Sequence, residues 1–325
     1  MWSSVISSPV TDIWCPYDSR RHQVTSAATV EEQLLDWALS SGLLPDERVE
    51  RRFRNARFGE CAALCYPDAT DLLVYAKWMT WLFVADDEFD ENRAPEHGGI
   101  DRGVLGYLPL DGAPAWEPTS AVTAALVELW REIAAPMPRP LQERFREHTE
   151  EYCRSYAEPL AKARTGQAPH LQDYVDLRRR SGAVETCVDL IERQPQAYLH
   201  PVLATAPAVT ALRLAANDVI CWTNDVLSVG KEVSHGELNN LVAVLQGGSG
   251  MNWPAAVSSA AAMTSARTKE FDELAEALMT EHPEPAVRAF VDGIKVWISG
   301  SLVWHLDSPR YANRIVQLPP QRSGL

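Results

Sequence analysis

An apolar stretch that ends in a cluster of carboxylates constrains this chain more than any other part of its sequence. Residues 70–90 are apolar on nearly every face of a helix, and five of the six residues from Asp86 to Glu91 are acidic. A helix that is apolar all round belongs in a core, so the pattern predicts an inner helix of a bundle. In that helix Asp86 and Asp90 lie one turn apart on the same face, with Asp87 beside them.

The carboxylate cluster indicates a site for a hard divalent cation. Like charges at this spacing destabilise a helix by roughly 0.2–0.5 kcal/mol per pair, and a bound cation relieves the repulsion. Mg²⁺ prefers oxygen ligands and typically takes one or two carboxylates, with water and phosphate completing its shell. The alternative is a helix that ends in solvent on an acidic tip, and this stretch alone leaves both open.

The rest of the chain also shows helical patterns, without the alternation of apolar and polar residues that strands require. No repeat or linker divides it, so we expect an all-α, single-domain bundle of about ten or more helices. The domain spans residues 29–317, after an irregular N-terminal strap (1–28) and before a tail (318–325) expected to be disordered. The predicted helices are 29–39, 46–65, 70–90, 119–135, 140–164, 170–194, 207–234, 237–246, 255–281 and 286–306.

Several of these helices carry signals for their ends. Thr29 is the expected N-cap of the first helix, which Gly42 can end. Gly182 lies inside the predicted helix 170–194, where a glycine costs about 1 kcal/mol relative to alanine and favours local unwinding. The glycines of residues 247–250 are expected to end the helix before them. The many Gly and Pro residues of 92–118 predict a long loop.

Composition excludes several classes of function. The net charge of −14 argues against a nucleic-acid partner, because phosphate backbones need a basic surface. No apolar run is long enough to span a membrane, and the N-terminus does not resemble a signal peptide. The six cysteines lack metal-binding spacing and are read as buried, reduced thiols. These features predict a cytoplasmic protein.

A second polar motif interrupts an otherwise apolar helix far downstream. Asn224, Ser228 and Glu232 follow one another at intervals of four, so they share one helix face. An amide oxygen, a hydroxyl and a carboxylate form a ligand set suited to Mg²⁺ or Mn²⁺. Lys231 is adjacent and can contact a phosphate, although polar residues at this spacing are also common on solvated faces.

The two motifs together resemble the paired metal motifs of the class I terpene synthases, bacterial cyclases in particular. Asp86-Asp87-x-x-Asp90 resembles the first, and Asn224-Asp225-x-x-Ser228-x-x-Lys231-Glu232 resembles the second. Three further segments support the resemblance, which covers residues 58–311: Asp176 to Gly182, Gly236 to Val242, and Arg310-Tyr311. Many members carry an acidic or small polar residue at the position of Ser181, as a link to the diphosphate-sensing arginine. The hydroxyl of Ser181 can serve as this link, but it cannot form a salt bridge.

The resemblance implies a set of roles for these residues. Three Mg²⁺ ions, with Mn²⁺ as the other candidate metal, are expected to hold an isoprenyl diphosphate. Metal ligands are expected at Asp86 with Asp87 or Asp90, and at Asn224, Ser228 and Glu232. Positive charge and hydrogen bonds for the diphosphate are expected from Arg178, Lys231, Arg310 and Tyr311. A backbone carbonyl freed near Gly182 is expected to help trigger ionisation.

Ionisation leaves an allylic carbocation, so the resemblance also implies a closed apolar cavity at the centre of the bundle. Aromatic faces stabilise cations by roughly 0.5–2 kcal/mol each. Phe83 is the best candidate, because it lies one turn before Asp86. Further candidates are Phe58, Trp78, Trp222, Trp297 and Trp304. The alternative for each of them is ordinary core packing.

The function this implies is the cyclisation of an isoprenyl diphosphate, with farnesyl diphosphate favoured and a sesquiterpene hydrocarbon or alcohol as product. Geranylgeranyl diphosphate is the alternative substrate. A chain-elongating prenyltransferase is less favoured, because it needs a second Asp-rich motif where this chain has Asn, Ser and Glu. A helical binding protein that has lost the chemistry is also less favoured, because every expected ligand is present. The sequence leaves a homodimer open.

Overall fold

The computed structural model describes residues 13–20, 26–90, 103–156, 169–235 and 238–311. Within these ranges, the side chains of residues 87–90 and 234–235 are not described. Residues 1–12 of the predicted strap and the whole predicted tail 318–325 lie outside the described residues. The division of the chain into strap, domain and tail therefore stays a prediction.

Every regular element in the described residues is a helix, which confirms the predicted all-α fold. The α helices are α1 (Ala27–Ser40), α2 (Glu47–Ala56), α3 (Phe58–Cys65), α4 (Leu72–Asp90), α5 (Ala121–Ala134), α6 (Arg139–Ser155), α7 (Leu171–Ser181), α8 (Val184–Glu192), α9 (Pro201–Ala204), α10 (Pro207–His235), α11 (Leu241–Ser249), α12 (Trp253–Glu281) and α13 (Pro285–Asp307). Short 3₁₀ helices are η3 (Val104–Tyr107), η4 (Pro195–Ala197) and η5 (Pro309–Tyr311). None of the α helices in these ranges has the length and apolar character needed to cross a bilayer.

Two segments predicted as single helices are each a pair of helices. The predicted helix 46–65 breaks at Arg57 (φ 55°), and the predicted helix 170–194 breaks at Ala183 (φ 54°). The left-handed conformation costs an ordinary residue roughly 1–2 kcal/mol, so tertiary packing must hold both positions. Arg57 is neither a glycine nor an asparagine, so the sequence pattern does not mark the first break. The second break lies next to Gly182, where the sequence favours local unwinding.

Two helix ends also differ from the predictions. Ser26 is the N-cap of α1, and its hydroxyl accepts a hydrogen bond from the N–H of Thr29, so Thr29 is not the cap. The two alanines at residues 27 and 28 favour this earlier start, because alanine is the strongest helix former. At the other end of the chain, α11 continues through Gly247 and Gly248, and Gly250 (φ 67°) ends it.

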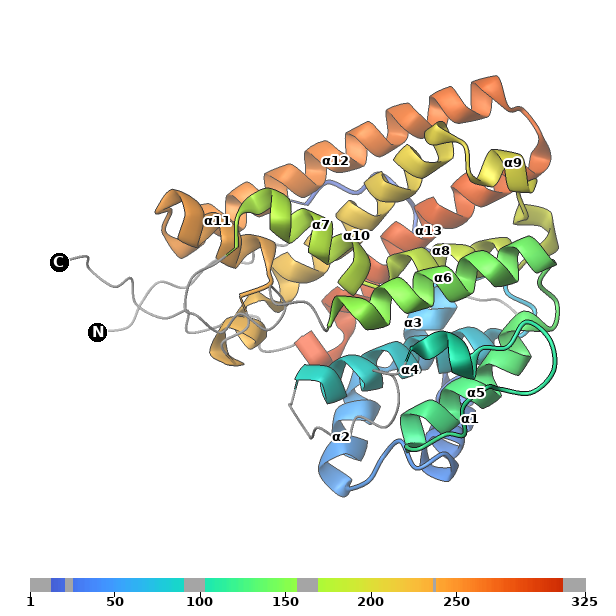
Figure 1. The fold of residues 1–325 in the computed structure, drawn as a ribbon. Helices are drawn as coiled ribbons and strands as arrows, with labels where there is room; N and C mark the ends of the chain where they lie inside the picture. The colour runs from blue at the N-terminus through green and yellow to red at the C-terminus, as the bar shows by residue number, and fades with distance from the viewer. Residues whose placement is uncertain (1–12, 21–25, 91–102, 157–168, 236–237, 312–325) are drawn as a thin grey trace.

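The helices form two groups that α3 and α13 join (Figure 1). The long helix α10 packs along α12 and also contacts α7, α8 and α13. α4 packs on α3 and α5, and α13 packs on α3. Trp78 and Trp81 of α4 are fully buried and stack at 5.1 Å between ring centroids, which confirms that this apolar helix is an inner one.

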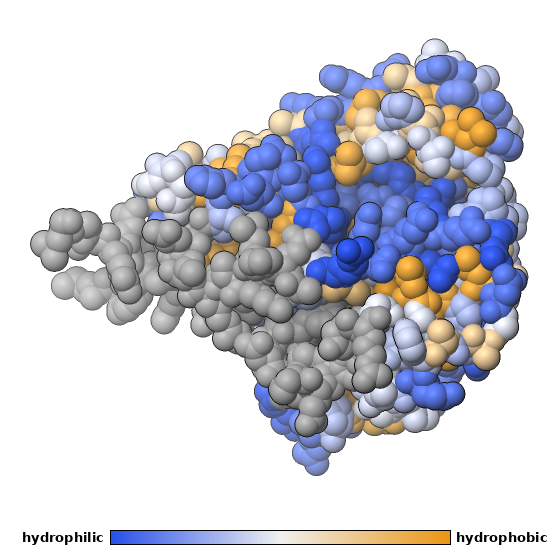
Figure 2. Space-filling model, in the orientation of Figure 1, coloured by the Kyte–Doolittle hydropathy of each residue, from blue (hydrophilic) through white to orange (hydrophobic). Residues whose placement is uncertain are grey.

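The surface of the face in Figure 2 is mainly hydrophilic, with apolar residues in separate patches. Large exposed apolar side chains among the described residues include Trp14, Leu39, Trp116, Leu171 and Val202, which come from different elements. Scattered exposed apolar residues are normal on a soluble protein and do not define an interface. The homodimer therefore stays a prediction.

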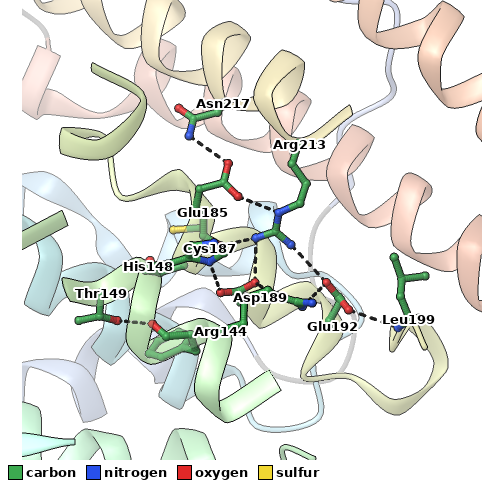
Figure 3. A network of polar contacts seen from close by, with 12 residues as sticks. Arg144, His148, Thr149, Glu185, Cys187, Asp189, Glu192, Leu199, Arg213 and Asn217 are labelled. Carbon is green, nitrogen blue, oxygen red and sulfur yellow. Dashed lines mark hydrogen bonds and ion pairs between the residues drawn. The ribbon is translucent and has the colours of Figure 1, made fainter. Parts of the chain in front are cut away.

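A network of charged side chains holds α8 between α6 and α10 (Figure 3). Its members are Arg144 and His148 of α6, Glu185, Asp189 and Glu192 of α8, and Arg213 of α10. The guanidinium of Arg213 donates to Glu185 (2.7 Å), Asp189 (2.8 Å) and Glu192 (3.2 Å). Because α8 begins directly after the break at Ala183, this network fixes the position of that break against α10.

A protonated His148 balances the charge of this network. Asp189 is fully buried and contacts Arg144 (2.9 Å) and His148 Nδ1 (2.6 Å) in addition to Arg213. Burial alone would lower the pKa of His148, but the charge and hydrogen bond of Asp189 outweigh it and raise the pKa above 6.5. With His148 protonated, three cations face three carboxylates in the interior.

The stability of the protein is expected to fall as pH rises through the folded-state pKa of His148. A raised folded-state pKa means that the folded protein holds this proton more tightly than the unfolded chain does. The stabilisation by protonated His148 is therefore complete below about pH 6.5, which is the pKa of this histidine in the unfolded chain. It is lost as the pH rises above the pKa of His148 in the folded protein. Urea unfolding measured from pH 6 to pH 9 tests this. His148→Gln should flatten the profile, and an unchanged profile would rule out His148 as its source.

Candidate active site

Three oxygen-bearing side chains follow one face of α10, at the spacing predicted from the sequence. The Ser228 hydroxyl donates to the backbone carbonyl of Asn224 (2.7 Å), and Glu232 accepts a hydrogen bond from the side-chain amide of Asn240 (2.9 Å). Burial, reinforced by the charge of Asp225, raises the pKa of the Glu232 carboxyl above 4.5. A cation beside Glu232 would counter this repulsion.

Arg178 reaches this face from the last turn of α7. Its Nη2 donates to the side-chain oxygen of Asn224 (2.9 Å), and its Nε donates to Asp225 (3.0 Å). The arginine side chain is 14 % exposed and Asp225 is 1 % exposed, so the ion pair is largely shielded from water. Burial alone would lower the pKa of the Arg178 guanidinium, but the negative charge of Asp225 outweighs it and raises that pKa well above its usual value. The expected diphosphate-binding arginine therefore lies directly beside the second motif.

Asp225 is the centre of the polar contacts around this arginine. Its carboxylate also accepts hydrogen bonds from the hydroxyl of Tyr174 and from the backbone N–H of Leu241 (2.7 Å). The carbonyl of Asp225 accepts from the amide of Asn240 (2.9 Å), the N-cap of α11. Asp225 therefore ties α7, α10 and the start of α11 together behind the metal motif.

The first acidic motif lies at the end of α4. Asp86 is half-buried and accepts a hydrogen bond from the hydroxyl of Tyr156, the C-cap of α6 (2.5 Å). Burial and the charge of Asp86 raise the pKa of Tyr156 well above 10, so the phenol stays a donor. Asp87 and Asp90 belong to the last turn of α4, but their side chains lie outside the described residues.

Aromatic side chains cluster one turn before Asp86. The rings of Phe58 and Phe83 stack at 5.0 Å, and Trp304 of α13 contacts them at 6.1 and 5.5 Å. The guanidinium of Arg310 lies 4.9 Å from the ring centroid of Phe83. A ring face that already holds a cation is suited to stabilising positive charge, by roughly 0.5–2 kcal/mol.

The C-terminal residues connect the two motifs. The ring of Tyr311 lies 5.5 Å from Trp304, and its hydroxyl is 3.4 Å from the amide nitrogen of Asn224. Trp304 in turn contacts Phe83 of α4. The acidic end of α4 and the oxygen face of α10 are thereby brought to the same end of the bundle, with η5 between them.

The predicted unwinding near Gly182 appears as the break between α7 and α8. Gly182 is the C-cap of α7 and packs directly on α10. A Cβ atom at Gly182 would lie 2.3 Å from the sulfur of Cys221 and 3.1 Å from the carbonyl of Arg178. Only glycine therefore lets the break lie this close to the helix that carries Asn224. The role of a backbone carbonyl here stays a prediction.

Replacing Gly182 with alanine is expected to destabilise the protein by about 1–3 kcal/mol, the usual effect of overpacking. The displaced α7 should also move Arg178 and lower kcat. The double variant Gly182→Ala, Cys221→Ala removes the sulfur and should recover most of the stability, with Cys221→Ala as the matched single control. Thermal unfolding and product formation measure the two effects, and a double variant no more stable than Gly182→Ala would contradict the steric account.

The remaining predicted site residues are more dispersed. Lys231 is exposed, one residue before Glu232. Trp78 lies in a separate cluster with Trp81 and Phe145, and its indole N–H donates to Thr186 (3.0 Å), as is typical of core packing. Trp222 of α10 and Trp297 of α13 are buried. The roles of these tryptophans in a cavity wall, and the central cavity itself, stay predictions.

Reasoning from the sequence gave no role to four residues at this site. Asp225 and Tyr174 surround Arg178, Tyr156 contacts Asp86, and His305 lies 2.9 Å from the side-chain amide of Asn224. A signal existed only for Asp225, an acidic residue on an apolar helix next to a predicted ligand. The others lie on helices whose contact with the motif depends on tertiary packing.

The side chains present fit a divalent cation. Asn224, Ser228, Glu232 and Asp86 offer only oxygen donors, which hard cations prefer. The positively charged guanidinium of Arg178 already donates a hydrogen bond to the Asn224 oxygen, which is the atom that would bind the metal. No three His, Cys, Asp or Glu side chains form a metal-binding group among those described, which do not include the side chains of Asp87 and Asp90. In the predicted ligand row of α10, Glu232 is the single carboxylate.

The fold and the site define an all-α protein with oxygen-bearing side chains and a buried arginine gathered at one end of its bundle. The family model described as terpene synthase family 2, C-terminal metal binding, matches residues 77–270, more than half of the chain. The chain is 33 % identical to (+)-T-muurolol synthase ((2E,6E)-farnesyl diphosphate cyclizing) of Roseiflexus castenholzii, over 88 % of this chain and 89 % of that one. It is 31 % identical to (-)-delta-cadinene synthase of Streptomyces clavuligerus, over 94 % and 95 %.

A solved structure agrees with these relatives. The crystal structure of a-eudesmol synthase superposes with a TM-score of 0.78 at 26 % identity, over 91 % of this chain and 98 % of that one. The chain belongs to the terpene synthase family, which confirms the resemblance inferred from the sequence motifs. It is an enzyme of the class I terpene synthase type, a family that binds a divalent metal and acts on isoprenyl diphosphates.

Proposed function

We propose that this enzyme is a Mg²⁺-dependent cyclase that ionises farnesyl diphosphate and closes the carbocation to a sesquiterpene hydrocarbon or alcohol. The observation that carries the proposal is the contact of Arg178 with Asn224 and Asp225. It places a fixed guanidinium beside the oxygen face of α10, where a diphosphate held by metal ions needs a further cation. A planar guanidinium binds phosphate oxygens with two parallel hydrogen bonds.

The proposed metal ligands are Asp86, with Asp87 or Asp90, and the row Asn224, Ser228 and Glu232. Three Mg²⁺ ions are proposed, with Mn²⁺ as a substitute. When bound, the ions neutralise the charge that develops on the leaving diphosphate. Arg178, Lys231 and Arg310 add positive charge to the same group, and the hydroxyl of Tyr311 donates a hydrogen bond. Burial raises the pKa of Tyr311 to about 12, so that hydroxyl stays protonated.

The aromatic cluster is proposed to exclude water and face the carbocation. Phe58 and Trp304 are almost completely buried, while Phe83 is half-buried and contacts Arg310. Phe83, one turn before Asp86, is therefore the ring proposed to stabilise a cation formed near Asp86. The remaining wall is proposed to include Trp78, Trp222 and Trp297.

Farnesyl diphosphate is favoured over geranylgeranyl diphosphate because (+)-T-muurolol synthase, a relative over 88 % of this chain, is named as cyclising farnesyl diphosphate. The test is incubation of the purified protein with Mg²⁺ and geranyl, farnesyl or geranylgeranyl diphosphate, followed by gas chromatography and mass spectrometry of the extract. A cyclic C15 product from farnesyl diphosphate alone is expected. A product only from geranylgeranyl diphosphate would replace the proposed substrate, and no product from any diphosphate would overturn the cyclase.

Two further arms of this experiment separate the rival activities. Addition of isopentenyl diphosphate should give no longer prenyl diphosphate, whereas a prenyltransferase would make one. Removal of divalent ions with EDTA should abolish product formation, and Mg²⁺ should restore it. Activity that survives EDTA would contradict the metal-dependent mechanism. A cytoplasmic location remains a proposal consistent with the family.

A further inference from the structure

We infer that His305 is a positioning residue for the metal ligand Asn224, because it fixes which atom of the Asn224 amide faces the metal site. The inference rests on the proposed role of Asn224 as a ligand. The two side chains come from different helices, α10 and α13, and meet at 2.9 Å between the amide nitrogen and His305 Nε2. A side-chain amide has one acceptor atom and one donor atom, and only the oxygen can bind a cation.

The contact with Arg178 shows which end of the Asn224 side-chain amide is the oxygen and which is the nitrogen. Its guanidinium carries only donors, so the Asn224 atom that lies 2.9 Å from Nη2 must be the oxygen. The amide nitrogen consequently points the other way, toward His305 and the hydroxyl of Tyr311 (3.4 Å). In this orientation the Asn224 oxygen faces the guanidinium of Arg178.

A backbone carbonyl of α13 shows which of the two imidazole nitrogens of His305 carries the hydrogen. His305 Nδ1 lies 2.6 Å from the carbonyl oxygen of Ser301, which can only accept, so Nδ1 carries the hydrogen. The amide nitrogen of Asn224 is a donor, so Nε2 must be the acceptor in this contact. The ring is therefore the neutral tautomer whose lone pair points at Asn224.

The imidazole is held firmly in this orientation. His305 is 5 % exposed, its ring lies 4.6 Å from that of Tyr311, and the ring of Trp304 contacts it edge-on at 4.9 Å. A flip of the Asn224 amide would place its NH₂ group against the guanidinium of Arg178, and neither of these two donors would then have an acceptor. The flip would also turn the oxygen away from Arg178. His305 opposes that flip before any metal arrives, as partners of metal ligands commonly do.

The test measures Mg²⁺ affinity in the presence of inorganic diphosphate, by calorimetry on the full chain, so that it does not depend on turnover. His305→Phe keeps an aromatic ring but has no nitrogen, and it should weaken Mg²⁺ binding about 10-fold. His305→Gln supplies an acceptor at the place of Nε2 and should bind Mg²⁺ within about two-fold of the wild type. Ser301→Ala, one turn away on α13, loses only a hydroxyl bonded to the carbonyl of Ile298 and is the matched control.

Failure of this inference and failure of the proposed function give different results. If Asn224→Ala binds Mg²⁺ and diphosphate as the wild type does, Asn224 is not a ligand and the proposed site is wrong. If Asn224→Ala loses binding while His305→Phe retains it within two-fold, only the positioning role is overturned. Should His305→Phe lack the helical circular dichroism of the wild type, His305→Leu provides the same comparison. Equal weakening in His305→Phe and His305→Gln would also overturn the role of the acceptor.

Discussion

Replacing Arg178 with glutamine is expected to lower kcat by about 10²–10³-fold, the usual effect of removing one group that stabilises developing charge. The same change should destabilise the fold by about 3–5 kcal/mol, because it leaves a carboxylate buried without its ion-pair partner. That carboxylate belongs to Asp225, whose side chain is 1 % exposed. Steady-state kinetics and urea unfolding measure the two effects separately.

A double variant separates the two roles of Arg178. In Arg178→Gln, Asp225→Asn both charges are gone, while Tyr174 and the backbone of Leu241 still have an oxygen to donate to. Most of the lost stability should return, but kcat should stay low, because no guanidinium remains for the diphosphate. A double variant with wild-type kcat would show that Arg178 matters only for folding.

Replacing Arg213 with methionine is expected to give the largest loss of stability of any single change considered, at least about 3–5 kcal/mol. Arg213 contacts three carboxylates in the interior (Figure 3), and its loss leaves these three carboxylates with two cations, Arg144 and His148, in the network. Methionine fills similar space, so the effect should come from charge and not from a cavity. Urea unfolding of the variant should show a lower midpoint with an unchanged slope.

The matched control is Arg54→Met, which breaks an exposed ion pair with Glu50 on α2. Exposed pairs of this kind contribute little, so the control should lose less than about 0.5 kcal/mol. Activity of folded Arg213→Met should also fall, because α8 and the break at Gly182 would no longer be fixed on α10. If the two methionine variants proved equally stable, the interior network would not be a major source of stability.

The helices and the unwinding next to Gly182 could largely be predicted from the sequence, but the break at Arg57 could not. The inner position of α4 follows from its apolar residues, which lie on every face of the helix. The breaks at Arg57 and Ala183 depend on contacts that compensate for strained backbone, and those contacts come from distant residues. The start of α1 at Ser26, three residues before the predicted cap, has a local cause, because the alanines at residues 27 and 28 are strong helix formers.

The metal motifs were predictable for a similar local reason. Asn224, Ser228 and Glu232 share a face because four residues make about one turn of any α helix. That geometry holds whatever surrounds the helix, so the sequence by itself determined which oxygen atoms stand together on α10. The same reasoning placed Asp86 at the end of an inner helix and Phe83 one turn before it.

Only the tertiary structure decided which groups these oxygens meet. Arg178, His305 and Tyr156 contact the motifs from α7, α13 and the end of α6, between 46 and 81 positions away in the chain. Such contacts depend on how helices pack, and packing is set by the shape of many buried side chains together. The chain's local periodicity therefore specifies which side-chain oxygens share a face, while the packing of its helices specifies their orientation and partners.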